Sequence, residues 1–171
     1  MLKSGFMLDI KILTPAKWTA LRDIRLEALR ESPQAFLSTH EKEAAWDEDQ
    51  WLAEFDRGDW SIGFLADQAV SLLGATRHAD MPWHECFLEY IWVAPEHRGA
   101  GLAQGMLAFT FGRLQTIGVQ TAYLYVLNGN DAARRLYEKA GFTSAREPEP
   151  LAEYPGRSEE LLRRSLRLEA G

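Results

Sequence analysis

One tight turn constrains the fold of this chain more than any other feature. It joins a segment rich in β-branched and aromatic residues, 85–93, to a helix-like run, 101–117, through Arg98-Gly99-Ala100-Gly101-Leu102-Ala103. The first N–H groups of a helix have no partners within the helix, and the helix dipole adds positive charge there. Small residues let a ligand approach this backbone closely. The turn therefore predicts a site for an anion such as a phosphate.

Other interpretations of the turn compete with this one. A P-loop needs GxxxxGK[ST], and the chain contains no such run. A dinucleotide-binding fingerprint needs GxGxxG, which Gly99 and Gly101 begin, but Gln104 stands where the third glycine should be. A strand–helix connection without any ligand stays open, because small residues are common in such turns.

A second patterned stretch lies downstream of a predicted strand at 121–127. Asn130 is placed to cap a helix, and Gly141 is placed to end it. Between them, one helix face carries Ala133, Leu136, Tyr137 and Ala140. A short strand, 142–145, should follow, before the interruption by Pro148 and Pro150.

The remaining segments complete the fold class. Helices are expected at 15–31, capped by Thr14, and from Asp47 to Phe55. Strands are expected at 8–13, 61–66, 69–77 and, by alternation, 162–168, with a hairpin turn at Asp67-Gln68. The order β-α-α-β-β-β-α-β-α-β-β predicts a mixed α/β (α+β) sheet with helices on its faces. A length of 171 residues suits one domain spanning 1–171.

Composition excludes several classes of partner. A net charge of −6 makes the chain a poor binder of nucleic acid. No apolar run approaches the roughly 18 residues of a membrane span, and no secretory leader is evident, so a cytoplasmic location is expected. Cys86 is the only cysteine. The cluster His78, His84, Glu85 and Cys86 fits no common zinc pattern, and we expect no metal.

The two motifs together resemble those of the GNAT superfamily of N-acetyltransferases. The superfamily's acetyl-CoA motif, Arg/Gln-x-x-Gly-x-Gly/Ala, matches residues 98–103. Its next motif, Asn-x-x-Ala-x-x-Leu-Tyr-x-x-x-Gly-Phe, matches residues 130–142, and Val93-Ala94-Pro95 fits the usual strand exit. The resemblance covers nearly the whole chain in element order and is concentrated in residues 90–142.

The resemblance implies a fold and a cofactor site. The sheet should be mostly antiparallel, with one splayed parallel pair that admits the pantetheine of acetyl-CoA. The residues implied for the cofactor are Ile91, Trp92 and Val93 on the strand, Arg98, Gly99, Ala100, Gly101, Leu102 and Ala103 at the pyrophosphate, and Asn130, Ala133 and Tyr137 on the opposite wall. Arg134 or Arg135 would either meet a CoA phosphate or lie solvated on the surface.

The resemblance also implies a direct transfer of the acetyl group to an amine. A backbone N–H near Val93 should stabilise the tetrahedral oxyanion, and Tyr137 should protonate the departing thiolate. The proton acceptor stays open between Glu89, Glu85 and a water relay. Cys86 is not at a motif position and is not expected to act as a nucleophile.

The amine acceptor is not determined by the motifs. Trp83, Trp92, the loop 148–156 and the acidic stretch 41–49 are candidates to border its pocket, although a solvated face explains the acidic stretch as well. Dimers are common in this superfamily, so the resemblance leaves a homodimer open. The alternative function is a non-catalytic acyl-CoA-binding or sensing domain of the same fold, and a nucleotide-binding regulatory domain is a more distant one.

Overall fold

A single twisted sheet organises the computed structural model, which describes residues 7–168. Its strands follow the order β1-β2-β3-β4-β5-β8-β6, with β7 paired to β8. They are β1 (Asp9–Ile12), β2 (Gly58–Leu65), β3 (Gln68–Thr76), β4 (Glu85–Val93), β5 (Thr121–Leu127), β6 (Thr143–Ser144), β7 (Glu149–Pro150) and β8 (Ser158–Ser165). Every strand pairing is antiparallel except the one between β4 and β5. The fold class expected from the sequence, a mostly antiparallel sheet with one parallel pair, is confirmed.

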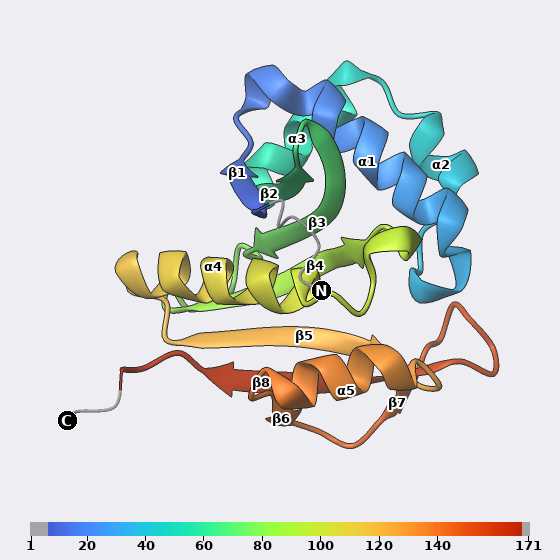
Figure 1. Cartoon of the computed structure of the whole chain (residues 1–171). Coiled ribbons are helices and arrows are strands. Elements are labelled where there is room, and N and C mark those ends of the chain that lie inside the picture. Colours follow the sequence, from blue (N-terminus) through green and yellow to red (C-terminus); the bar gives the residue numbers. More distant parts are fainter. Residues whose placement is uncertain (1–6, 169–171) are drawn as a thin grey trace.

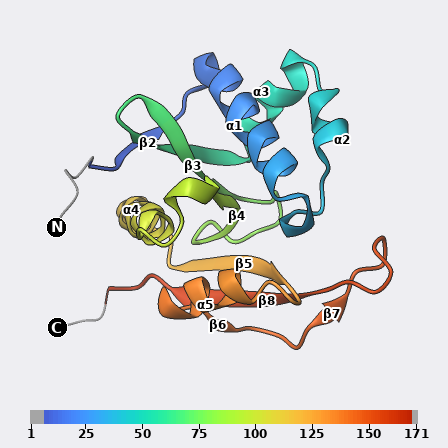
Figure 2. The same ribbon diagram turned by 45° about the vertical axis from the view of Figure 1, so that its right-hand side comes forward.

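The helices divide the molecule into two parts. They are α1 (Trp18–Glu31), α2 (His40–Ala44), α3 (Glu48–Arg57), α4 (Leu102–Thr116) and α5 (Asp131–Lys139). Figures 1 and 2 show α1, α2 and α3 gathered beside β1 to β3, while α4 lies beside β3 and β4 and α5 lies beside β5 and β8. One apolar core joins α1 and α3 to the first strands, and a second joins α4 and α5 to the later ones. Residues of β3 and β4 contribute to both cores.

Most of the residues predicted to cap or end a helix do so in the structure, but Thr14 does not. Asp47 caps α3 through a capping box, in which its carboxylate accepts from the Gln50 N–H at 2.9 Å and the Gln50 side chain accepts from the Asp47 N–H at 3.0 Å. Gly118 and Gly141 follow α4 and α5 in the left-handed conformation that favours glycine. Thr14 precedes a short 3₁₀ turn, Pro15–Lys17, and its side chain makes no capping hydrogen bond.

The structure also corrects the sequence prediction at α2, at the last strand and at the short strand β7, which includes Pro150. Helix α2 was not predicted, because five residues are too few to show a helical period, although the Thr39 hydroxyl caps it by accepting from the Lys42 N–H at 3.2 Å. The last strand begins at Ser158 rather than Leu162 and ends at Ser165. Leu168, expected to alternate inward, is 81% exposed. Within residues 7–168, no helix is long and apolar enough to cross a membrane.

Candidate active site

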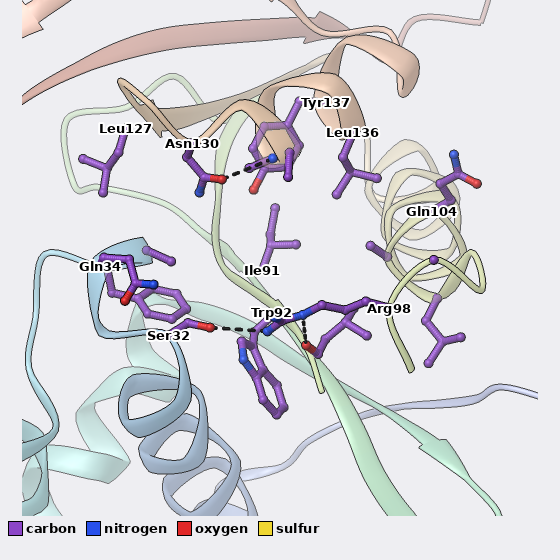
Figure 3. Close-up of a pocket in the computed structure, with 18 of the residues that line it drawn as sticks. Ser32, Gln34, Ile91, Trp92, Arg98, Gln104, Leu127, Asn130, Leu136 and Tyr137 are labelled. Carbon is purple, nitrogen blue, oxygen red and sulfur yellow. Dashed lines mark hydrogen bonds between the residues drawn. The ribbon is translucent and has the colours of Figure 1, made fainter. Parts of the chain in front are cut away.

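The parallel pair opens toward the carboxyl ends of its strands. β4 and β5 pair only at Glu85–Phe87 against Thr121–Tyr123, and no further rungs follow. On its other edge β4 carries a bulge, because Tyr90 and Ile91 together stand opposite Leu73 of β3. Tyr90 has a positive φ of 57°, which is uncommon for a residue with a side chain. The bulge redirects β4, and a cavity of about 820 Å³ lies where β4 and β5 are no longer paired (Figure 3).

The strand wall of this cavity contains all three residues predicted for it. Ile91, Trp92 and Val93 line the cavity. The Trp92 indole is only 4% exposed, belongs to the α1 core and donates to Glu31 at 2.9 Å, so its ring is not available to a ligand. Figure 3 shows this indole turned away from Tyr137 on the opposite wall. What Trp92 presents to the cavity is backbone.

The glycine turn forms one end of the cavity. Gly99 and Gly101 have φ values of 77° and 85°, and a Cβ at either would meet nothing closer than 3.8 Å. The turn therefore needs glycine for its backbone conformation rather than for space. Within the described part of the chain, the N–H groups from Gly99 to Gln104 make no hydrogen bond. They form a row of donors at the start of α4, which is the geometry of an anion site.

Of the other turn residues, Arg98, Leu102 and Ala103 line the cavity and Ala100 does not. The Arg98 guanidinium is already engaged: it donates to the Val93 carbonyl at 3.0 Å and to the Glu31 carboxylate at 2.6 Å. Burial opposes ionisation of Glu31, but its bonds with Ser32, Trp92 and Arg98 outweigh this and lower the pKa of its carboxyl. Arg98 thus ties the end of α1 to the exit of β4.

Helix α5 supplies the opposite wall. Asn130 caps the helix by accepting from the Ala133 N–H at 3.3 Å, and both residues line the cavity. Tyr137 extends from α5 toward Ile91 across the gap (Figure 3). Its side chain is 92% buried within the α4–α5 core, and this burial raises the pKa of the phenol to about 12. No residue within 7–168 hydrogen-bonds its hydroxyl, and the raised pKa keeps the phenol protonated at neutral pH, so Tyr137 presents a proton donor to the cavity that it lines.

A second cavity of about 380 Å³ adjoins the first one. The two share several lining residues, namely Ala35, Phe36, Ile91, Leu127, Asn130, Ala133 and Tyr137. Glu89, the predicted base, lines only the second cavity, where its carboxylate accepts from Arg57 at 2.7 Å. Glu85 lines neither cavity and lies at the paired end of β4, 3.4 Å from the Tyr123 hydroxyl.

Several other sequence candidates lie away from these cavities. Trp83 packs against Gly118, at the far end of α4, and borders neither of them. Arg134 forms ion pairs with Glu138 and Glu160. Burial raises the pKa of the Cys86 thiol to about 12, which leaves the group a poor nucleophile. Within residues 7–168, no cluster of side chains has the composition of a metal site.

The acidic stretch 41–49 is not simply a solvated face. Glu43 is 1% exposed and forms a two-pronged ion pair with Arg25 of α1, with both N–O distances at 2.9 Å. The Arg25 guanidinium stacks over the Tyr90 ring at 3.5 Å. The expectation of a solvated face is wrong for Glu43, because Arg25 is buried too and requires a compensating charge.

Sequence reasoning missed several residues of both cavities. They are Gln34, Ala35 and Phe36 in the loop after α1, Arg57 at the end of α3, and Arg157 and Glu159 near the start of β8. The loops carry no motif, and β8 was expected to begin only at Leu162. No local signal would have placed Glu159 in a cavity, because its position depends on pairing between β8 and β5.

The sequence matches a family model and several curated acetyltransferases. The family model described as "Acetyltransferase (GNAT) family" matches residues 18–142. Mycothiol acetyltransferase of Thermobispora bispora is 30% identical over 129 residues, covering 57% of this chain and 43% of that protein. The uncharacterized N-acetyltransferase YycN of Bacillus subtilis is 29% identical over 83 residues, covering 48% of this chain and 53% of that protein. The chain thus spans about half the length, or less, of the curated relatives it matches.

Solved structures share the fold over nearly the whole chain. yncA of Salmonella typhimurium, described as a putative acetyltransferase with its cofactor acetyl-CoA, has a TM-score of 0.76 at 16% identity, covering 96% of this chain and 97% of that one. The ribosomal-protein-S18-alanine N-acetyltransferase of Escherichia coli has a TM-score of 0.68 at 21% identity, covering 96% of this chain and 97% of that one.

Proposed function

The chain belongs to the GNAT family of acetyltransferases, and from this premise we propose that it transfers the acetyl group of acetyl-CoA directly to a primary amine. One observation carries the proposal. A single cavity has a row of unbonded backbone N–H groups at one end and a buried, protonated tyrosine hydroxyl on its wall. These are the groups needed to hold a diphosphate and to protonate a departing thiolate.

The cofactor would lie along the opened edge of β4. Its pyrophosphate would accept from the N–H groups between Gly99 and Gln104, and its pantetheine would run beside the backbone of Ile91, Trp92 and Val93. The acetyl-CoA present in the Salmonella neighbour supports this choice of cofactor. Arg98 would border the pyrophosphate while it remains tied to Glu31, which compensates its charge.

The chemistry would follow from the position of Tyr137. A neutral amine attacks the thioester carbonyl, a backbone N–H near Val93 stabilises the oxyanion, and the C–S bond breaks as the sulfur takes the Tyr137 proton. With a pKa of about 12, the phenol remains protonated at neutral pH and is ready to donate. Its burial also keeps bulk water from competing for that proton.

The role predicted for Glu89 changes in this proposal. Arg57 donates to Glu54 and to Glu89, at 2.7 Å in each case. The charge of Glu89 is therefore compensated within the protein, and an incoming ammonium group would gain little from it. We assign Glu89 a place in the wall of the acceptor side, held there by Arg57, rather than the role of general base.

Two measurements on the purified chain test the proposed function. Calorimetry should detect acetyl-CoA binding, with NAD and ATP as negative controls. A thiol-release assay with a broad amine panel should detect turnover that depends on both substrates. Tight binding of CoA with no turnover on any amine would favour the non-catalytic sensing domain, and the absence of acetyl-CoA binding would contradict both functions.

A further inference from the structure

The second cavity has an aromatic wall. Phe87 of β4 and Tyr125 of β5 are stacked, with ring centroids 5.6 Å apart and planes within 8° of parallel. His78 meets the Phe87 ring edge-on at 5.2 Å, and all three residues line the cavity. Tyr125 is 43% exposed, so the wall is open to a ligand. Flat rings of this kind favour an apolar or aromatic group that can lie against them.

The buried charges of this cavity are compensated by protein groups. Arg25 is paired with Glu43, although its buried Nη1 has no hydrogen-bond partner within the described residues, and Arg57 is paired with Glu54 and Glu89. Glu159 differs from these residues. It lines the same cavity, yet no side chain within residues 7–168 bonds or ion-pairs with its carboxylate. An unpaired carboxylate in a partly buried cavity attracts a cation more strongly than a paired one does.

Strand pairing accounts for the position of Glu159. It stands opposite Leu127 in the β5–β8 ladder, and Leu127 lines both cavities. Side chains of directly opposed residues lie on the same face of a sheet. Glu159 therefore projects on the face of β5 that carries Leu127 and Tyr125, beside a residue, Leu127, that both cavities share. Burial, and then the charge of Glu149 on β7, raise the pKa of the Glu159 carboxyl, which makes it a better proton acceptor than an ordinary glutamate.

We propose that Glu159 binds the ammonium group of the acceptor and takes its proton, and that the Phe87–Tyr125 wall holds a flat apolar group attached to that amine. The substrate class is thus an arylalkylamine with no negative charge near the nitrogen. This inference rests on the proposed function and adds to it the chemistry of the acceptor. A zwitterionic amino acid fits less well, since its carboxylate would lie close to Glu159 and Glu89.

Atoms and charges balance in this scheme. The ammonium group gives one proton to Glu159, and the neutral amine forms the new C–N bond at the thioester carbon. The C–S bond then breaks, and the sulfur receives the Tyr137 proton. The surplus proton on the amide nitrogen passes through water to the tyrosinate, and Glu159 releases its proton to solvent. The net products are the amide, free CoA thiol and one proton.

The first test compares acceptors on the intact protein with saturating acetyl-CoA. Phenethylamine, hexylamine and phenylalanine differ in the ring and in the carboxylate, and kcat/KM should be at least about 10-fold higher for phenethylamine than for the other two. Faster turnover of hexylamine or phenylalanine would overturn the inference and leave the proposed function standing. No acetyl-CoA-dependent thiol release with any amine would overturn the proposed function itself.

The second test changes the carboxylate. Glu159→Gln should lower kcat/KM for phenethylamine about 100-fold, while the Kd for acetyl-CoA stays unchanged. Glu159→Asp should recover part of the loss, and Glu27→Gln, at an exposed position outside both cavities, should match the wild type. Equal activity of Glu159→Gln and Glu27→Gln would overturn the inference.

A third measurement separates proton transfer from a structural effect. β,β-Difluorophenethylamine keeps the ring but is largely uncharged at mildly alkaline pH. With this amine the loss caused by Glu159→Gln should shrink to about 10-fold or less, because no proton has to be removed before attack. An equal loss with both amines would show that the substitution acts through the fold, and would overturn the assignment of Glu159 as the proton acceptor.

Discussion

The two ends of the β4–β5 pair differ in strand pairing and in side-chain burial. At one end, the strands are paired at Glu85–Phe87 and Thr121–Tyr123, and the small side chains of Cys86 and Ala122 are at most 1% exposed within the α4–α5 core. At the other end, the pairing has stopped and a cavity of about 820 Å³ lies between the strands. Two neighbouring strands thus serve as core at one end and as a candidate active site at the other.

The residue that separates the two ends is Tyr90. Its φ of 57° is strained, and the surrounding structure has to hold it in place. Its ring stacks on Trp60 with centroids 4.8 Å apart, lies 3.5 Å from the Arg25 guanidinium, and places its hydroxyl 3.4 Å from Glu54. Packing around one side chain thus fixes where β4 departs from β5. The comparison teaches that substitutions at the paired end should act on stability, and substitutions at the open end on binding and rate.

The largest effect should come from the open end. Tyr137→Phe removes the proposed proton donor and leaves the ring in its place. We expect kcat to fall about 100- to 10,000-fold, while the Kd for acetyl-CoA and the melting temperature change little, because the hydroxyl has no bonding partner within residues 7–168. Steady-state kinetics with calorimetry measures both quantities.

The pH dependence of the wild type sharpens this prediction. Burial raises the pKa of Tyr137 to about 12, so the phenol should keep its proton beyond the ordinary tyrosine range of about 10. A loss of kcat near that ordinary value, absent in Tyr137→Phe, would contradict a buried donor. Unchanged turnover of Tyr137→Phe at saturating substrates would remove Tyr137 from the chemistry altogether.

The paired end should respond in the opposite way. Ala122→Leu adds volume at a position with no exposed surface, which typically costs about 1–3 kcal/mol of unfolding free energy. For a chain of this size, the melting temperature should fall by roughly 2–4 °C per kcal/mol. The Kd for acetyl-CoA should remain within about twofold. Ala108→Leu, at an exposed position of α4, is the matched control and should leave both quantities unchanged.

A change at the glycine turn should weaken binding without unfolding the chain. Gly101→Ala places a Cβ on a residue with φ of 85°, which costs roughly 1–2 kcal/mol, although the space is free. If the free turn relaxes to avoid the strain, acetyl-CoA must restore it, and the Kd should rise about 5- to 30-fold. Gly112→Ala, in the interior of α4 with nothing nearby, should keep the wild-type Kd and gain a little stability. Equal Kd values for the two variants would contradict an anion site at the turn.

Local patterns in the sequence predicted the elements that form the open end. The boundaries of β4 and β5 match the prediction, and the capping of α5 by Asn130 follows from residue type and spacing. The positive φ of Gly101 is also a local property, because only glycine adopts it at no cost. Each of these features is determined within about ten residues of chain.

The residues of the acceptor side could not be predicted in the same way. Arg25 and Glu43 lie on different helices, and their ion pair is visible only after α1 and α2 are packed together. Glu159 faces the second cavity because β8 pairs with β5 in one register, and a shift by one residue would turn it to the other face. The bulge at Tyr90 likewise depends on β3, so a period-2 pattern along β4 alone gives no sign of it.

The smallest effect should come from the contacts that bridge the open end. The Tyr154 hydroxyl donates to the Leu37 carbonyl, and Arg157 donates to the Gln34 carbonyl, both at 2.8 Å, so the loop before β8 is joined to the loop after α1. Tyr154→Phe removes one neutral hydrogen bond, worth about 0.5–1.5 kcal/mol, at a partly buried position. We expect the melting temperature to fall by no more than a few degrees and the KM for acetyl-CoA to rise about two- to threefold, because Gln34 and Arg157 both line the first cavity. Since Phe keeps the ring, a loss of unfolding free energy of about 3 kcal/mol, the upper limit expected for Ala122→Leu, would show that the open end contributes as much to stability as the paired end, and would contradict the division between the two ends.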